Sequence, residues 1–558
     1  MGIFQRKKGS TEIDPDVIFL DSVNLPDFNT QQFEGRLERP ISKRSVVGLG
    51  VVFALCIGAY AWKIGDLQVV NGQTFRERSS YNTLKQIPVF GERGTIVDRN
   101  GVELALNTEK GRSYLKEDGL AHVLGYVGLP TKRELASSTE FSTEEYIGKA
   151  GVEKAFNDEL RGASGLKLAE VDAKGVVQTE NVYRPPLPGA TLALSIDQRL
   201  QTELYKSIQS VAEDRGFTGG AGVMMDVRTG EIVAMTSYPE YNPTTFAQGD
   251  DAKYISETLN DSKRLPLLNR ALSGIYTPGS VIKPIMATAA LSEHVVTPDH
   301  EILSTGSISI QSPYDKNVKT VFRDWQRQGY LDMPHAIAMS SDVYFYEVGG
   351  GFEGQKGLGI ANIDKYMRMF GLAQKTGIEL DNEGVGVIPT PEWKAANFNG
   401  EDWRIGDTYH TSIGQYGFGV TPLQMVRAIA AIASYGKLFT PTMRKIEATS
   451  SVQYTTLSID KKVFDVVHDG MRLSATIGTG KGLNVPYVEI ASKTGTAELG
   501  VSKAKVNSWV EGFFPYKDPK YAFAIVMEKG PVHNTIGGVF VARQMFDWMN
   551  INTPEYFK

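Results

Sequence analysis

Three short groups of residues have the side-chain types and the spacing that acyl-transfer chemistry needs. In the first, Ser280 precedes Lys283 by three residues, after a Pro-Gly pair and at the start of an apolar run that predicts a helix to Leu291. Residues three apart on a helix share a face, so a neutral lysine amine can accept the serine proton. The free N–H groups at the start of such a helix favour a developing oxyanion.

The spacing Ser-x-x-Lys alone does not select Ser280, because it occurs five more times, at Ser113, Ser164, Ser434, Ser458 and Ser502. What distinguishes Ser280 is the Pro-Gly pair before it, the apolar helix after it, and the presence of the two other groups further along the chain.

The second group is Ser340, Ser341 and Asp342, which follow a predicted helix from Pro334. A hydroxyl here can relay a proton between Lys283 and a leaving amine, and the carboxylate can bind a substrate amide or orient a lysine. Taken alone, the group is better explained as a polar kink in a helix.

The third group is Lys493–Thr496, which follows a predicted strand at 487–491. A lysine and two hydroxyls on an edge strand can bind a carboxylate, and Gly495 lets a substrate backbone approach closely. A similar run, Lys375–Gly377, stands in a turn after a helix, which favours a structural role.

The elements that must position these groups form a sheet and a helical lobe. Residues 221–225 and 231–235 predict a hairpin, and 508–514 and 521–527 predict two strands that close the chain. The long segment between these strands is mostly helical in pattern. Strands at both ends of a helical middle indicate an α+β domain with an antiparallel sheet.

A membrane anchor precedes this domain. Residues 45–62 are a run of 18 without a charge, with basic residues before it and aromatic residues at its far end. The alternative is a helix buried in a soluble core. The sequence predicts a cytoplasmic tail at 1–44, a transmembrane helix at 45–63, a pedestal with a proline-rich linker at 64–189, and the main domain outside the cytoplasm at 190–558.

Composition excludes several other classes of function. Hydrophobic residues make up 41% and charged residues 22%, as in ordinary globular proteins, and a net charge of −5 gives no basic excess for nucleic acid. The only cysteine, Cys56, lies in the predicted anchor, which excludes disulfides and thiolate metal sites. None of the seven histidines forms an H-E-x-x-H pair, so we predict no metal and no cofactor.

In this order, the three groups are the motif set of penicillin-binding proteins and serine β-lactamases. Beyond the tail, the chain resembles a class B penicillin-binding protein over nearly its whole length. Arg93–Gly101 is similar to the membrane-proximal signature of that family, and further similar stretches are Trp403–Thr408, Ile413–Gln415 and Val420–Gln424. The elongation-type branch, penicillin-binding protein 2, is most similar, on the basis of Ser340–Asp342, Trp403–Thr408 and Pro391–Lys394.

The resemblance implies a peptidoglycan D,D-transpeptidase, with a penicillin-binding transpeptidase domain on a small pedestal, that cross-links stem peptides and is acylated by β-lactams. It implies that Ser280 is the acylated nucleophile, Lys283 its base and Ser340 a proton shuttle. The backbone N–H groups of Ser280 and Thr496 are then the oxyanion hole.

For substrate binding, the resemblance implies that Lys493 supplies positive potential, while Thr494 with Thr496 binds the terminal carboxylate of D-Ala-D-Ala or of a β-lactam. Gly495 between them belongs to the same substrate-binding strand. Asp342 departs from the commoner Asn of the second motif. Because Asp cannot donate an amide hydrogen bond, its contact with substrate differs from the usual one.

The pedestal and the partners are also expectations of the resemblance. Only 16 residues separate Ala105 from His122, where the family usually carries a larger head lobe, so we expect a trimmed pedestal. The expected partner in the bacterial inner membrane is a SEDS-family glycosyltransferase. Small residues of the anchor allow close approach of a partner helix: Gly48, Gly50, Ala54 and Gly58.

Three alternatives stay open at this point. One is a division-type transpeptidase with the same chemistry. Another is a non-catalytic β-lactam-binding sensor or scaffold, which the single span and the complete set of catalytic side chains disfavour. The third is a hydrolase, either a carboxypeptidase or a β-lactamase, which the anchor and pedestal disfavour.

Overall fold

The computed structural model describes residues 42–76, 84–137, 141–171, 177–311, 315, 317–447 and 451–558. The chain divides into two compact units, one made of Met1–Lys85 with Ala169–Glu180 and the other of Gln86–Leu168 with Asn181–Lys558. Most of the predicted cytoplasmic tail, residues 1–41, lies outside the described residues.

The first unit contains one long apolar helix, α1 (Lys43–Gly65), followed by a short π-helix at Asp66–Val70. Ser42 caps α1 by accepting a hydrogen bond from the Ser45 N–H at 3.1 Å. None of its 23 residues is buried, and they span about 35 Å, more than a hydrocarbon core of ~30 Å. The helix is therefore long and apolar enough to cross a membrane, as predicted for 45–63.

The N-terminal part of the second unit consists of short elements. Three strands each contain residues of both units: β1 (Leu84–Val89), β7 (Gly165–Val171) and β8 (Val177–Arg184). A four-stranded sheet has the order β4-β3-β2-β9, and β5 pairs with β6. The bounds are β2 (Ile96–Val97), β3 (Glu103–Thr108), β4 (Gly111–Tyr114), β5 (Val127–Gly128), β6 (Ile147–Gly148), β9 (Leu192–Ala193), α3 (Ala121–Leu124), α4 (Lys132–Ser137), α5 (Gly151–Ala155) and α6 (Asn157–Arg161).

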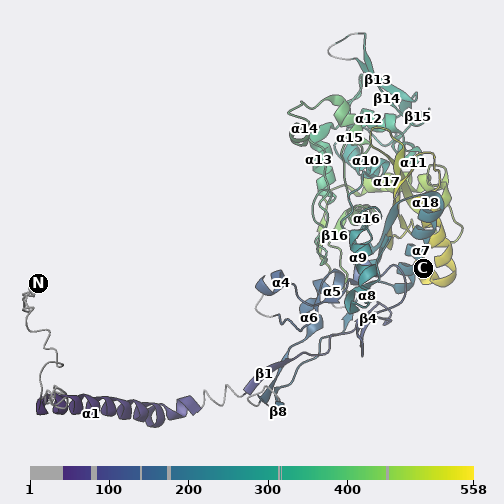
Figure 1. The fold of residues 1–558 in the computed structure, drawn as a ribbon. Helices are drawn as coiled ribbons and strands as arrows, with labels where there is room; N and C mark the ends of the chain where they lie inside the picture. Colours follow the sequence, from purple (N-terminus) through teal and green to yellow (C-terminus); the bar gives the residue numbers. More distant parts are fainter. Residues whose placement is uncertain are drawn as a thin grey trace, which may run out of the picture. The chain divides into compact units, whose positions relative to one another are not determined.

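A five-stranded antiparallel sheet forms the centre of the larger part of this unit, in the order β11-β10-β20-β19-β18. Its strands are β10 (Gly219–Asp226), β11 (Ile232–Tyr238), β18 (Ala491–Leu499), β19 (Lys505–Phe514) and β20 (Tyr521–Pro531). Two helices, α7 (Gln198–Arg215) and α18 (Gly538–Asn552), lie side by side against the sheet (Figure 1). Sequence reasoning placed β10, β11, β19 and β20 correctly but was wrong in ending the chain on strands, because α18 follows β20.

The helical lobe packs against the sheet through α16 and α17, and α17 also contacts α10 and α11 (Figure 1). Its helices are α8 (Pro243–Gln248), α9 (Ala252–Asn260), η4 (Gly279–Ile282), α10 (Lys283–Ser292), α11 (Met333–Met339), α12 (Asp342–Gly350), α13 (Gly359–Met369), α14 (Pro391–Asn397), α15 (Ile405–Ser412), α16 (Pro422–Ala433) and α17 (Lys461–Thr476). Short strand pairs and turns complete it: β12 (Ile302–Ser304), β13 (Ser307–Gln311), β14 (Lys319–Arg323), β15 (Gly329–Leu331), β16 (Lys437–Phe439), β17 (Tyr454–Thr456), η5 (Lys481–Leu483) and η6 (Pro554–Phe557).

Helix α16 shows why the lobe is stable where it meets the sheet. All twelve of its residues are buried, and it begins with a capping box in which Thr421 and Gln424 bond each other's backbone N–H. Pro422 occupies the first turn, where its missing N–H has no intrahelical partner to lose. The predicted α+β architecture, an antiparallel sheet with a helical lobe, is confirmed.

Candidate active site

The first motif lies where η4 runs into α10, so Ser280 and Lys283 belong to one continuous helical segment, as predicted. Gly279 has a φ of +58°, which disfavours side chains, and Pro284 is tolerated in the first turn of α10. Lys283 is fully buried, whereas Ser280 is partly exposed. A molecule from solvent can therefore reach the candidate nucleophile.

The other five Ser-x-x-Lys runs lack this arrangement. In none of them do the serine and the lysine lie in one continuous helical segment; the five serines stand in strands, turns or loops: Ser113, Ser164, Ser434, Ser458 and Ser502. Local conformation therefore separates Ser280 from the sites that spacing alone does not exclude.

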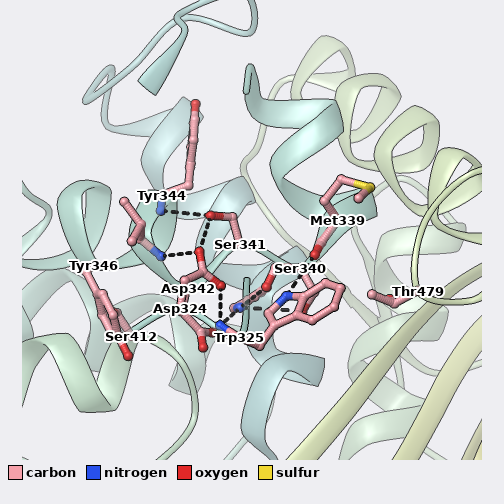
Figure 2. A network of polar contacts seen from close by, with 12 residues as sticks. Asp324, Trp325, Met339, Ser340, Ser341, Asp342, Tyr344, Tyr346, Ser412 and Thr479 are labelled. Carbon is pink, nitrogen blue, oxygen red and sulfur yellow. Dashed lines mark hydrogen bonds and ion pairs between the residues drawn. The ribbon is translucent and has the colours of Figure 1, made fainter. Parts of the chain in front are cut away.

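The second motif forms a break between α11 and α12. Ser340 has a φ of +56°, in the left-handed region that residues other than glycine rarely adopt. Asp324 holds the turn, because its Oδ2 accepts hydrogen bonds from the Ser341 hydroxyl at 2.8 Å and the Val343 N–H at 3.0 Å (Figure 2). Ser341 in turn caps α12. The break between the helices is thus part of the motif, and backbone strain of this kind clusters at functional sites.

Two lysines converge on this break. Lys283 Nζ donates to the Asp342 carboxylate at 2.6 Å and to the Ser340 carbonyl oxygen at 2.9 Å. Lys493 Nζ donates to the Ser340 hydroxyl at 2.8 Å. Both lysine side chains are fully buried, and Asp342 is 19% exposed. Ser340 therefore connects the amines of the first and third motifs, which lie far apart in sequence.

The third motif lies inside β18, the edge strand of the sheet, as the order of strands shows. The strand begins at Ala491, so the prediction of a strand at 487–491 before the motif was wrong. A Cβ on Gly495 would lie 2.9 Å from the Pro278 carbonyl oxygen and from Val281 Cγ1. Glycine is needed here because β18 packs directly against η4, which brings the third motif to the nucleophile.

The two threonines of the third motif differ in their surroundings. The Thr494 hydroxyl donates to the hydroxyl of Thr479 at 2.6 Å. Thr496 is exposed, and its carbonyl oxygen lies 3.0 Å from where a Cβ on Gly279 would stand. Thr496 is thus adjacent to the start of η4, next to Ser280.

Burial shapes the electrostatics of the site. It lowers the pKa of Lys493 well below the ordinary value, and the Lys283 cation acts in the same direction. Burial also raises the pKa of Asp342, while the adjacent Lys283 acts in the opposite direction. Two amines and a carboxylate thus share a region poor in water, an arrangement typical of functional sites.

The structure brings Lys283, Ser340, Asp342 and Lys493 into one hydrogen-bonded network, which spacing alone did not predict. The Ser280 hydroxyl makes no hydrogen bond within the described part of the chain. Its proximity to Lys283 therefore comes from their positions in the helical segment. Apo geometry of this kind does not exclude a nucleophile and base.

Sequence reasoning missed three residues of the site. Asp324 and Thr479 are ordinary polar residues in loops, with no local signal that they contact motif residues. Glu511 is different, because a charged residue inside the otherwise apolar strand 508–514 is a signal that was visible. Among the described residues, no group of three or more His, Cys, Asp or Glu side chains is placed to hold a metal ion.

Comparison with known families agrees with this geometry. The penicillin-binding protein transpeptidase domain matches residues 220–546, and the penicillin-binding protein dimerisation domain matches residues 107–194. The chain belongs to the penicillin-binding protein transpeptidase family, in its elongation-type class B branch. It is a penicillin-binding-type transpeptidase, and with α1 it is membrane-anchored.

Individual relatives support the branch. The peptidoglycan D,D-transpeptidase MrdA of Haemophilus influenzae is 30% identical over 95% of this chain and 96% of its own. That of Acinetobacter baumannii is 34% identical over 76% of this chain, which spans 64% of that relative's length.

Solved structures agree. PBP2 of Helicobacter pylori, in a complex with MreC, has a TM-score of 0.71 at 28% identity and covers 84% of this chain and 99% of its own. PBP2 of Pseudomonas aeruginosa, in complex with WCK 5153, has a TM-score of 0.70 at 29% identity and covers 85% and 98%.

Proposed function

We propose that this protein is the peptidoglycan D,D-transpeptidase of cell elongation, acting through an acyl-enzyme on Ser280. The Ser280 oxygen attacks the carbonyl carbon of the penultimate D-alanine, and its proton passes to the Lys283 amine, which is neutral while Asp342, whose pKa burial raises, holds the proton of the pair. The C–N bond to the terminal D-alanine then breaks, and the leaving amine takes a proton through the Ser340 hydroxyl. A second stem-peptide amine attacks the ester, forms the cross-link and returns a proton to Ser280.

One observation carries this proposal. The Lys283–Ser340–Lys493 hydrogen-bond chain runs between the helical segment that holds the partly exposed Ser280 and the edge strand β18. A proton path, a positive potential and an accessible hydroxyl in one place are the parts that acyl transfer from an anionic peptide requires. Thr494 and Thr496 on the edge strand then receive the substrate carboxylate, with Lys493 supplying the positive charge.

Labelling with a fluorescent penicillin tests the nucleophile directly. The full-length protein in detergent should carry one adduct, and mass spectrometry of its peptides should place it on Ser280. Ser280→Ala should carry none, while Ser434→Ala is a matched control because Ser434 has the same Ser-x-x-Lys spacing and should be labelled like the wild type. An adduct on any other serine contradicts the assignment.

The finer localisation is also part of the proposal. The basic residues Arg39, Lys43 and Arg44 before the apolar run favour a cytoplasmic location for the tail 1–44 and a catalytic domain outside the inner membrane. Cysteine accessibility tests this in cells: with Cys56→Ser as background, a cysteine introduced at exposed Thr143 should react with a membrane-impermeant thiol reagent, and one introduced at Ser10 should not. The reverse pattern contradicts the orientation.

The proposed partner is a SEDS-family glycosyltransferase that docks on α1. A structure titled as a peptidoglycan synthase complex that coordinates polymerisation and cross-linking supports this, with a TM-score of 0.70 and 25% identity over 90% of this chain. Gly50, Ala54 and Gly58 recur every four residues and so share one face of α1. Nothing else in the described structure lies within 4 Å of a Cβ on Gly50 or Gly58.

The anchor contains its own control for this partner. Gly48 was expected on the same docking face from composition alone, but it lies about 200° around the helix from Gly50, so it is not on the face that Gly50, Ala54 and Gly58 share. Gly50→Leu should reduce recovery of the glycosyltransferase when the protein is purified from membranes, whereas Gly48→Leu should not. Equal recovery with both variants contradicts docking on this face.

Depletion of the protein should give round cells, and filaments instead would assign it to division.

A further inference from the structure

Glu511 is a buried carboxyl that the proposed mechanism does not use. It stands in β19 directly opposite Lys493 of β18, and paired residues of neighbouring strands point to the same face of a sheet. Its other cross-strand neighbour, on β20, is Ala524. Of these two cross-strand neighbours of Glu511, only Lys493 carries a charge.

Neither packing nor hydrogen bonding in the described structure explains why residue 511 carries a carboxyl group. Its side chain is 0% exposed, and neither carboxyl oxygen has a hydrogen-bond partner within the described part of the chain. A buried carboxyl without hydrogen bonds destabilises the fold, so an apolar residue would serve packing better. An explanation for its presence must therefore involve its charge.

Lys493 lacks a paired carboxylate of its own. Within the described residues its Nζ bonds two neutral oxygens, the Ser340 hydroxyl at 2.8 Å and the Thr494 carbonyl at 2.7 Å. Lys283, by contrast, has Asp342 at 2.6 Å. Two lysines and two carboxyls thus occupy the site, and Glu511 is the carboxyl left to balance Lys493.

We infer that Glu511 is a positioning residue that maintains the positive charge of Lys493 and thereby sets the pH range over which Ser280 is acylated. The inference rests on the proposed function, because Lys493 is the cation that receives the substrate carboxylate there. Glu511 does not touch substrate; it acts through Lys493.

The other charged groups around Lys493 do not replace Glu511. A charged Lys283 disfavours a second positive charge on Lys493. The Asp342 carboxylate is already paired with Lys283. The helices that pack on this part of the sheet carry three titratable groups bonded to a backbone carbonyl: Arg427 on α16, and His468 and Arg472 on α17. The other charged residues of α17 are Lys461, which pairs with Asp465, Asp469, which bonds Tyr516, and the exposed Lys462.

The sign of the effect follows from these charges. Burial lowers the pKa of Lys493 and raises that of Glu511, and each opposes the shift of the other. The fully protonated pair has a net charge of +1 and becomes neutral when it loses one proton. An anionic substrate then favours the state in which the amine keeps its proton and the carboxyl is ionised. Without the carboxyl, the amine loses its charge at lower pH, so the alkaline decline of acylation moves to lower pH.

The test is the rate of acylation by a fluorescent penicillin as a function of pH. Glu511→Gln and Glu511→Met both remove the charge at similar volume, and both should move the alkaline decline to lower pH by about one unit or more. Glu511→Asp, which restores the carboxyl, should move it back toward the wild type. Glu489→Gln, at an exposed carboxylate near β18, is the matched control and should leave the profile unchanged.

Each result decides between the two proposals. An unlabelled wild type refutes the proposed function itself. A labelled wild type whose profile Glu511→Gln and Glu511→Met leave unchanged overturns the role of Glu511 alone. If neither variant folds, as judged by thermal unfolding, the carboxyl is needed for the fold and the inference is likewise overturned.

Discussion

Glu153 in the pedestal and Glu511 in the sheet are both fully buried carboxyls of the same unit, with opposite surroundings. Each Glu153 oxygen accepts a guanidinium N–H, from Arg93 at 2.6 Å and from Arg112 at 2.7 Å. Neither Glu511 oxygen has a hydrogen-bond partner among the described residues, and its lysine neighbour bonds elsewhere. We call the first group, Glu153 with its two arginines, the pedestal cluster.

The difference separates two uses of buried charge. In the pedestal cluster, charge-assisted hydrogen bonds compensate desolvation, so the carboxylate fixes one arrangement of the chain. Around Ser340, the charges are only partly compensated, so the protonation states of the amines and carboxyls respond to a ligand. Mutations in the first region should therefore change stability, and mutations in the second should change rate and pH dependence.

The largest expected effect is on rate. Lys283→Ala removes the general base and should slow acylation of Ser280 by about 10²–10⁴-fold, while Lys493→Ala should mainly weaken it. Stopped-flow or gel labelling with a fluorescent penicillin measures both. Similar small effects of the two substitutions would contradict the roles assigned to them.

The pedestal cluster should respond in the opposite way. Glu153→Gln leaves two buried arginines without their carboxylate, and the free energy of unfolding should fall by about 3–5 kcal/mol. Urea unfolding measures the loss, and the acylation rate of the molecules that remain folded should match the wild type. Glu144→Gln, at an exposed position of the same region, should change stability by less than about 0.5 kcal/mol.

Asp342→Asn should have a smaller effect, confined to pH dependence. The two side chains are isosteric and Asn is the commoner residue in this motif, so the fold and acylation should be retained. Burial raises the pKa of Asp342, and Asn cannot titrate, so the variant should lose the part of the acylation profile that follows the titration of this carboxyl. An unchanged profile, or a lower melting temperature with loss of labelling, would show that this pair has another role.

How much the sequence predicted depends on how far apart in the chain the interacting residues lie. Local patterns identified Ser280 at a helix start, the strands of the sheet and the anchor, because periodicity and turn residues report on neighbours in the chain. They did not show that Lys493 bonds Ser340, since that contact joins residues 153 positions apart. The left-handed Ser340 likewise depends on Asp324, whose sequence context is unremarkable.

Glu511 marks where the sequence could have told more. A charged residue at an inward position of an apolar strand violates the alternation that packing requires, and such violations concentrate at functional sites. For Gly495, by contrast, the sequence pattern was noticed but its cause was assigned wrongly. Sequence reasoning assigned its missing side chain to substrate approach, whereas the described structure uses the space for η4.

A partly buried carboxyl, Glu240, sharpens the comparison, because its partners are backbone N–H groups without a cation. It accepts hydrogen bonds from Gly119 at 2.6 Å and Ala121 at 3.0 Å, and burial raises its pKa to about 7. The folded state therefore holds a proton that the unfolded state has already released above about pH 4.5. Its contribution to stability is fully present below that pH and is lost as the pH rises through about 7.

The expected loss is at most about 3 kcal/mol between pH 5 and pH 8, smaller than the effect of breaking the pedestal cluster. Glu240→Gln cannot titrate and should reduce the pH dependence of unfolding in urea by up to that amount. Glu257→Gln, at an exposed carboxylate on α9, should leave it unchanged. An identical pH dependence in wild type and Glu240→Gln would mean that two backbone N–H groups suffice to keep this partly buried carboxylate charged, so that Glu240 would resemble Glu153 more than Glu511.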